Sequence, residues 1–234
     1  TFLNNPVGYF IAQDPSLILV IQPTFEMAQT WSKDRFAPML RDSPALKDLV
    51  QDPRARSSNN TILHKTFAGG HITMAGANSA SSLASRPIRI VFLDEVDRFP
   101  TSAGTEGDPV ALAKKRTTTF WNRKIIMTTT PTVKGASRIE QAFSESDQRK
   151  YYVPCPKCGE YQILMWSNIR WDQDENQKHL PDTAHYVCDH CEYKMKESDK
   201  SRLLLGGEWR ATEESNRIAG FWINEIYSPW VSWS

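Results

Sequence analysis

The four cysteines of this 234-residue chain stand in two pairs of identical spacing. Each pair has the form CxxC: Cys155 with Cys158, and Cys188 with Cys191. Four thiolates on two such turns suit tetrahedral Zn²⁺. The gap between the pairs exceeds the roughly 15–20 residues usual for this pattern and leaves room for a strand hairpin. We therefore predict a closed, structural Zn²⁺ site of the zinc-ribbon kind.

Other interpretations of these cysteines are a redox pair, which the symmetric duplication argues against, or four unrelated core thiols. We expect the hairpin within residues 161–169, accompanied by Trp166 and Trp171. His185 and His190 lie near or within the second pair. Because four sulfurs already complete a tetrahedral shell, we expect neither histidine to be a ligand.

Carboxylates directly follow the clearest buried strand that the sequence predicts. In PIRIVFLDEVDRF, Asp94 and Glu95 come after the apolar run and Asp97 follows two residues later. This is the form of a Walker B element, in which one carboxylate holds Mg²⁺ and the next polarises the water that attacks the γ-phosphate of ATP. We assign these roles to Asp94 and Glu95 respectively. The alternative is an acidic cluster that merely ends a strand and caps the following turn.

Two further segments resemble parts of nucleotide-driven translocases. VIQPTFEMAQTW, a strand followed by Pro-Thr and a helix, resembles a helicase motif Ia, and TTTP at residues 128–131 ends the next predicted strand. A threonine hydroxyl there can sense the γ-phosphate, and we assign this role to Thr129. The alternative is ordinary strand chemistry, since threonine is common in strands. The small-residue segment 75–87 is expected to be a loop.

The elements that position these residues alternate between strands and helices. Apolar runs at 17–22, 88–93 and 125–129 predict buried strands, and 61–65 with 71–75 predicts a strand pair around Gly69 and Gly70. A helix is expected from residue 24, with Thr24 as its N-cap. Strands joined by helical crossovers predict an α/β fold with a parallel sheet.

Composition sets limits on function. The formal net charge is +1, so the overall charge does not indicate nucleic-acid binding. Contact with DNA would need a local basic patch. No apolar run approaches the roughly 20 residues that span a bilayer, so no membrane role is expected. The pattern changes near Lys150, and we predict domains at 1–150, 151–217 and 218–234.

The phosphate-binding loop of P-loop ATPases, GxxxxGK[ST], is missing from the sequence. In this class of fold the loop precedes a helix that leads into the first predicted strand, so residues 1–10 match the end of that helix. We expect the chain to be a piece of a longer protein whose phosphate loop lies upstream, and this piece to be inactive alone.

Taken in order, these elements resemble the large terminase subunit of tailed bacteriophages, of the lambda type. The segments that carry the resemblance are DPSLILVIQPTFEMAQTWSKDRFAPML, VFLDEVDRFP, TTTPTVKGASRIE, DQRKYYVPCPKCGEYQ, YVCDHCEY and GFWINEIYSPW. The resemblance implies a RecA-like P-loop ATPase sheet, without its P-loop strand, that carries a small zinc-ribbon insert.

The resemblance also implies a function. The whole protein would be an ATP-driven motor that packages double-stranded DNA, with an endonuclease domain after residue 234. Residues 218–234 would return to the core or lead to that domain. Implied partners are a small terminase subunit, the portal ring of the procapsid and further copies of the chain, in the cytoplasm of the host cell.

Two rival hypotheses remain at this point. A superfamily 2 helicase fragment would share the strand-end carboxylates, but DEVD followed by a zinc ribbon fits that class poorly. A zinc-ribbon adaptor on a degenerate α/β scaffold would bind DNA or protein without catalysis, and the adjacent carboxylates argue against it.

Overall fold

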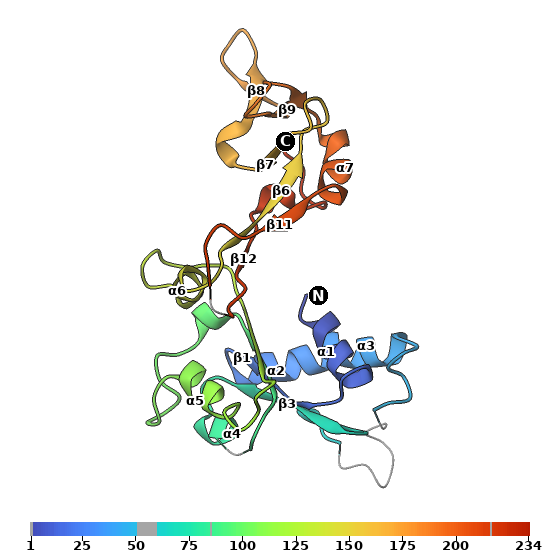
Figure 1. The fold of residues 1–234 in the computed structure, drawn as a ribbon, viewed down its shortest axis with the longest axis vertical. Coiled ribbons are helices and arrows are strands. Elements are labelled where there is room, and N and C mark those ends of the chain that lie inside the picture. The colour runs from blue at the N-terminus through green and yellow to red at the C-terminus, as the bar shows by residue number, and fades with distance from the viewer. Residues whose placement is uncertain (1, 51–59, 85, 216) are drawn as a thin grey trace. The chain divides into compact units, whose positions relative to one another are not determined.

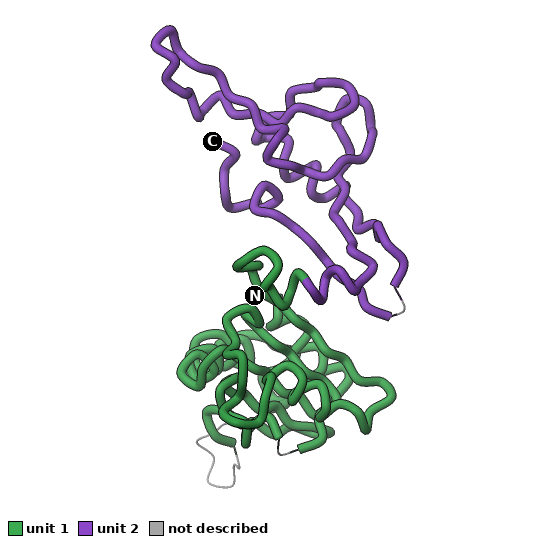
Figure 2. Tube along the Cα trace, turned by 90° about the vertical axis from the view of Figure 1, so that its left-hand side faces the viewer, with its two compact units in different colours: residues 1–140 green, residues 141–234 purple. Residues whose placement is uncertain are grey.

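Strands and helices alternate through the first part of the chain, as the sequence predicts. The computed structural model describes residues 2–50, 60–84, 86–215 and 217–234. The chain folds into two compact units, Thr1–Glu140 and Gln141–Ser234, which Figure 2 shows in different colours.

The first unit is organised by a five-stranded sheet in the order β2-β3-β1-β4-β5. β3, β1, β4 and β5 run parallel, and β2 pairs antiparallel with β3 at one edge. The predicted parallel α/β fold is therefore confirmed for this unit. The strands are β1 (Leu17–Gln22), β2 (His64–Phe67), β3 (Gly70–Gly76), β4 (Ile90–Asp94) and β5 (Lys124–Thr128).

Helices cover both faces of this sheet (Figure 1). One face packs against the helices nearest the N-terminus, and the other against the helices around β4. The segment 75–87, expected to be a loop, instead contains a short helix whose Leu83 is buried. The helices are α1 (Asn4–Ala12), α2 (Phe25–Trp31), α3 (Ala37–Asp42), α4 (Ala80–Ala84) and α5 (Pro109–Lys115), and a π-helical turn at Ser32–Phe36 joins α2 to α3.

Side chains of the central strands alternate between these two cores. In β1, Ile18 and Val20 belong to the core under α1 and α2, whereas Leu19 and Ile21 belong to the core under α4 and α5. A strand buried on both faces needs apolar residues at every position, which explains the continuous run LILVI. Gln22 breaks this run at the carboxyl end of the strand.

The start of α2 follows the predicted cap. The Thr24 hydroxyl accepts a hydrogen bond from the backbone N–H of Met27 at 3.2 Å. Such a bond satisfies one of the N–H groups that have no partner in the first turn. The chain therefore turns from β1 into α2 here, and Gln22 is the last residue of β1 at the carboxyl ends of the strands.

The second unit contains two small sheets. One sheet has the order β10-β9-β8, and in the other β6 pairs with β11, β12 and β7. Its elements are α6 (Arg138–Ser144, which begins in the first unit), β6 (Arg149–Pro154), β7 (Tyr161–Ile163), β8 (Ile169–Gln173), β9 (His179–Val187), β10 (Lys194–Met195), α7 (Lys200–Leu205), β11 (Glu208–Arg210) and β12 (Phe221–Trp222).

The hairpin between the cysteine pairs differs from the prediction. It is formed by β8 and β9 rather than by residues 161–169, because β7 pairs with β6 instead of folding back on itself. Ile226, Tyr227 and Trp233 of the last segment, 218–234, pack in the core of this unit beside Cys155 and Cys188.

Candidate functional site

Three polar residues end neighbouring strands of the parallel sheet. Asp94 on β4 lies opposite Thr128 on β5 in the strand register. The Thr128 hydroxyl donates to Asp94 Oδ1 at 2.9 Å, and the Gln22 side-chain amide donates from β1 to Asp94 Oδ2 at 2.9 Å. Because the carboxyl ends of parallel strands form the usual ligand-binding edge, this row lies where a substrate is expected.

Glu95 adopts a backbone conformation that is uncommon for a residue with a side chain. Its φ of 55° and ψ of 47° are left-handed, and such conformations persist mainly where the surrounding structure requires them. The Glu95 carboxylate accepts a hydrogen bond from the Thr129 hydroxyl at 3.4 Å and lies 3.3 Å from the Arg98 guanidinium. The turn at Glu95 therefore separates the two adjacent carboxylates, one bonded to Thr128 and the other to Thr129.

A cavity of about 360 Å³ opens over these residues. Its polar wall combines the two carboxylates with the three consecutive threonines of the TTTP segment. Its apolar wall comes from the residues just before α1 and from Trp31 at the end of α2. The lining residues are Phe2, Leu3, Trp31, Arg35, Asp94, Glu95, Thr128, Thr129 and Thr130. Arg35 adds a cationic group, so the cavity can take an anionic ligand together with a divalent cation.

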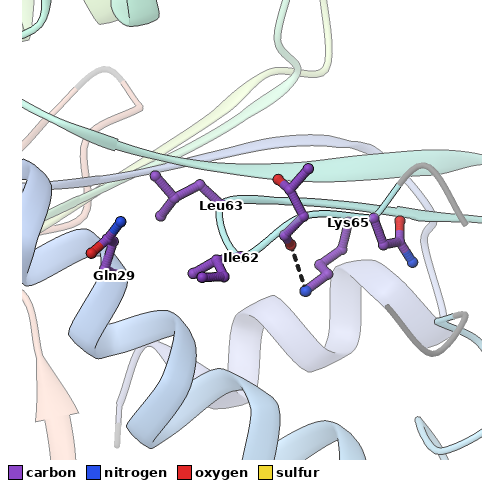
Figure 3. A pocket seen from close by; sticks show the side chains of 6 residues that line it. Gln29, Ile62, Leu63 and Lys65 are labelled. Carbon is purple, nitrogen blue, oxygen red and sulfur yellow. Dashed lines mark hydrogen bonds between the residues drawn. The ribbon is translucent and has the colours of Figure 1, made fainter. Parts of the chain in front are cut away.

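A second cavity, of about 520 Å³, shares none of these lining residues. Figure 3 shows Gln29, Ile62 and Leu63 around it, with the Lys65 ammonium donating to the backbone carbonyl of Thr61 at 2.5 Å. Among the residues that the structure describes, no carboxylate lines this larger cavity. We therefore place the candidate chemistry in the smaller cavity, where the titratable groups meet.

Asp97 connects the segment after β4 to the segment after β5. Its carboxylate accepts from the backbone N–H of Thr132 at 3.1 Å and of Ile139 at 3.0 Å. Burial acts to raise the pKa of Asp97, but hydrogen bonds from Ser137, Ile139 and Thr132 outweigh it, so the pKa lies below its usual value. Asp97 is therefore a structural acid rather than a further group in the cavity.

Arg138 fixes the same segment from the other side. Its guanidinium donates to the backbone carbonyls of Val96, Phe99 and Pro100 and forms an ion pair with Asp108 at 3.3 Å. Fixed donors on three carbonyls hold the turn that carries Glu95. This role of Arg138 could not be predicted from the sequence, because carbonyl partners leave no pattern in residue types.

The four cysteine sulfurs gather in the second unit. All four lie within 4.8 Å of one another. Cys155 Sγ lies 3.7 Å from Cys191 Sγ, and Cys158 Sγ lies 3.9 Å from Cys188 Sγ. Zn–S bonds of about 2.3 Å in a tetrahedron place sulfurs about 3.8 Å apart. Two of the sulfur pairs match this spacing, and the four sulfurs lie close enough to hold a metal ion.

The two CxxC turns have matching backbone geometry. In the first, the N–H of Gly159 donates to the Cys155 carbonyl at 2.9 Å, and in the second the N–H of Glu192 donates to the Cys188 carbonyl at 3.1 Å. Gly159 and Glu192 both have positive φ, at 78° and 56°. This repeated turn directs each pair of sulfurs to one point.

Donors around one sulfur favour its thiolate. The amide of Gln162 and the backbone N–H of His190 point to Cys188 Sγ, at 3.5 and 3.4 Å. Burial acts to raise the pKa of Cys188, but the backbone N–H groups of His190 and Cys191 outweigh it and lower the pKa to about 7. A thiolate is the form that binds metal.

One known family matches the part of the chain that contains both candidate sites. The model of the ATPase domain of the phage terminase large subunit gpA matches residues 1–209, which include the two adjacent carboxylates and all four cysteines. The chain belongs to this gpA terminase family. Membership confirms the family that the sequence motifs indicate.

Curated relatives within the terminase family are similar over most of the chain. The large terminase subunit of Enterobacteria phage P21 is 31% identical over 86% of this chain, and that of Escherichia phage lambda is 29% identical over 82%. The matched regions make up 32% and 31% of those relatives. The chain thus spans about a third of the length of the terminase subunits it matches.

A solved structure is also similar to this terminase chain. The large terminase ATPase domain of Thermus phage P74-26 has 16% sequence identity and a TM-score of 0.40, covering 68% of this chain and 64% of that one.

The structure brings together most of the residues singled out from the terminase sequence. Asp94, Glu95 and Thr129 line one cavity, and the four cysteines form one cluster. The prediction did not include Gln22 or Arg35. Gln22 carries a readable signal, since it is the one polar residue in the run LILVIQ. Arg35 lies in the π-helical turn after α2, and only the packing of that turn places it at the cavity.

Proposed function

We propose that this chain carries the ATP-hydrolysing site of a motor that packages double-stranded DNA. The observation that supports this most strongly is the pair Asp94 and Glu95 at the carboxyl edge of the parallel sheet, in one cavity with Thr128 and Thr129. Family membership supports ATP hydrolysis in general. The packaging activity of the whole protein is inferred from the terminase name of its relatives.

Asp94 is the proposed Mg²⁺-binding carboxylate. Each of its oxygens accepts one hydrogen bond, and an ionised carboxylate has about four acceptor positions, so capacity remains for a metal or its waters. Oxygen ligands of this kind are those that Mg²⁺ prefers. Bound Mg²⁺ would neutralise charge on the phosphates of ATP. The carboxylate oxygens of Asp94 are thus suitable ligands for Mg²⁺.

Glu95 is the proposed catalytic base. Its carboxylate contacts Thr129 and Arg98 rather than the partners of Asp94, and it lines the same cavity. A carboxylate there can accept the proton of the attacking water while Asp94 serves the metal. Thr129 donates to Glu95. The Thr129 hydroxyl also lies 3.1 Å from the Thr130 carbonyl, and its one hydrogen serves one acceptor at a time. We propose that Thr129 reports the state of the γ-phosphate by turning its hydroxyl from Glu95 toward the phosphate.

The cysteine cluster is the proposed Zn²⁺ site, and its role is structural. Four sulfurs complete a tetrahedral shell and leave no open position for catalysis. Cys155 and Cys188 also belong to the core of the second unit. We propose that Zn²⁺ stabilises a zinc-ribbon-like part at residues 151–217, distinct in function from the ATPase core at 1–150.

The partners that we propose come from the terminase family. They are double-stranded DNA, a small terminase subunit, the portal ring and further copies of the chain, with an endonuclease activity elsewhere in the whole protein. The proposed location is the cytoplasm of the infected host cell. Among the helices that the structure describes, none is long and apolar enough to cross a membrane.

The deciding experiment measures DNA-stimulated ATP hydrolysis by the full-length protein and its Glu95→Gln variant. The amide keeps the size of the side chain but cannot accept a proton, so we expect a loss of about 100-fold or more in kcat. Glu106→Gln, an exposed glutamate in the same unit, is the matched control and should retain full activity.

Either of two results would overturn the proposal. Folded, zinc-loaded wild type without DNA-stimulated hydrolysis would favour the non-enzymatic adaptor. A fully active Glu95→Gln variant would remove the base role from Glu95.

A further inference from the structure

Gln22 occupies a position where the fold alone would favour an apolar side chain. It ends β1, whose Ile18 and Val20 lie in the core on the same face of the sheet. Only 3% of Gln22 is exposed. A buried amide lowers stability unless it is hydrogen-bonded, so a functional reason for its presence is to be sought in its partner.

The backbone of Gln22 is held firmly. β1 pairs with β3 on one side, where Gln22 lies opposite Gly76, and with β4 on the other. The Gln22 carbonyl also accepts a bond from the Ala77 N–H at 2.8 Å. The amide therefore projects from a rigid central strand rather than from a loop.

The partner of this amide is the proposed Mg²⁺-binding carboxylate. Gln22 Nε2 donates to Asp94 Oδ2 while the Thr128 hydroxyl donates to Oδ1, both at 2.9 Å. Two neutral donors from two different strands fix the plane of the carboxylate. Neither donor cancels its negative charge, whereas a lysine or arginine at position 22 would compete with a bound cation.

We propose that Gln22 is a positioning residue that orients Asp94 for Mg²⁺, an inference that rests on the proposed ATPase function. Residues that hydrogen-bond to metal-binding carboxylates typically contribute 10–100-fold to metal affinity or activity. Gln22 acts on the metal through Asp94 and is not itself a ligand. Without its amide the Asp94 carboxylate gains rotational freedom, and Mg²⁺ must order it on binding.

The test compares nucleotide binding with and without Mg²⁺ in the full-length protein. The probe is fluorescently labelled ADP, titrated in Mg²⁺ and again in EDTA, so the readout does not depend on hydrolysis. Gln22→Met keeps the length of the side chain and removes the donor, and Gln22→Leu is a second variant that suits the apolar face. Gln29→Met, on α2 and beside the other cavity, is the matched control.

We expect Gln22→Met and Gln22→Leu to raise the Mg²⁺ concentration needed for half-maximal binding about 10-fold. The affinity for ADP in EDTA and the melting temperature should stay close to wild type, which a merely structural role would not produce. Gln29→Met should behave as wild type in every measurement.

Asp94→Asn separates failure of this inference from failure of the proposed function. If wild type shows no Mg²⁺-dependent binding, or Asp94→Asn leaves it unchanged, the proposed metal site itself is wrong. If Asp94→Asn abolishes the dependence and both Gln22 variants match wild type, the role of Gln22 alone is overturned. Equal losses with and without Mg²⁺ would also overturn it, since they indicate a general packing defect.

Discussion

At the scale of single residues, the turn that carries Glu95 is held by side chains from the segment after β5. Arg138 donates to three backbone carbonyls of residues 96–100, and Asp97 accepts from two N–H groups of residues 132–139. Arg138 of the later segment thus donates to the turn, whereas Asp97 of the turn accepts from the later segment. Together they hold the loop after β4 against the segment after β5.

Arg138→Met tests this linkage. We expect a loss of about 2 kcal/mol in the free energy of unfolding, because hydrogen bonds from a charged group contribute roughly 1.5–3 kcal/mol and the side chain is partly exposed. Urea unfolding measures it. Arg41→Met is the control, since the ion pair of Arg41 with Asp42 is exposed and its loss should change stability much less. Equal effects of the two substitutions would contradict the linkage.

The lowered pKa of Asp97 predicts that the stability of the protein depends on pH. Its folded pKa is lowered, so its contribution to stability is complete above the unfolded pKa of about 4 and is lost as pH falls through the folded value. We expect the stability difference between wild type and Asp97→Asn to shrink as pH falls below about 4. Urea unfolding at a series of pH values checks this, and a difference that stays constant would show that Asp97 acts only through its shape.

At the scale of elements, the carboxyl edge of the sheet depends on a close approach between β3 and the start of α2. A Cβ added at Gly76 would lie 2.5 Å from the Phe25 nitrogen and 2.8 Å from the Thr24 carbonyl carbon. These are backbone atoms, which cannot rotate away as the end of a side chain can. Glycine at this position therefore lets the chain turn from β1 into α2 beside the candidate site.

Gly76→Ala should destabilise the protein by roughly 1–3 kcal/mol, the usual range for overpacking. Gly8→Ala in α1 is the matched substitution and should stabilise by roughly 0.5–1 kcal/mol, because its Cβ would meet only side-chain atoms at 3.4 Å and beyond. Thermal and urea unfolding of both variants provide the measurement. Tolerance of alanine at position 76 would show that the α2 start can move.

At the scale of the whole molecule, the two units differ in what stabilises them. The first has large cores on both faces of its sheet, whereas the core of the second is smaller and includes Cys155 and Cys188. Small units with a small core commonly depend on a metal or on disulfides. The cysteines are free in this structure, and their sulfurs have the spacing of a metal site.

Removal of metal should therefore unfold the second unit and leave the first intact. We expect one Zn²⁺ per chain by metal analysis, and faster hydrogen exchange after chelation confined to residues 141–234. Cys158→Ser should lose the ion, whereas His190→Ala should retain it, since only the backbone N–H of His190 contacts a sulfur. Full protection after removal of the metal would rule out a structural role for Zn²⁺.

Sequence by itself determined the elements and much of the chemistry. Continuous apolar runs placed β1, β4 and β5 to within about two residues, because strands buried on both faces exclude polar residues. Each CxxC spacing brought two sulfurs together because such a short turn is a local structure, and the repeated spacing predicted that the two pairs would meet. Adjacent carboxylates at the end of a buried strand indicated the candidate site, because ligands usually bind at the carboxyl ends of parallel strands.

Only the tertiary structure decided how these pieces meet. Strand register sets Gln22, Asp94 and Thr128 side by side, and residues 72 and 34 positions apart along the chain cannot show this in a pattern of types. The hairpin is formed by β8 and β9 rather than by the predicted residues 161–169, because β7 pairs with β6. Arg35 and Arg138 depend likewise on packing and on backbone carbonyls. Local sequence encodes strands, caps and turns. Contacts between distant segments are fixed only when the strands pair and the helices pack on the sheet.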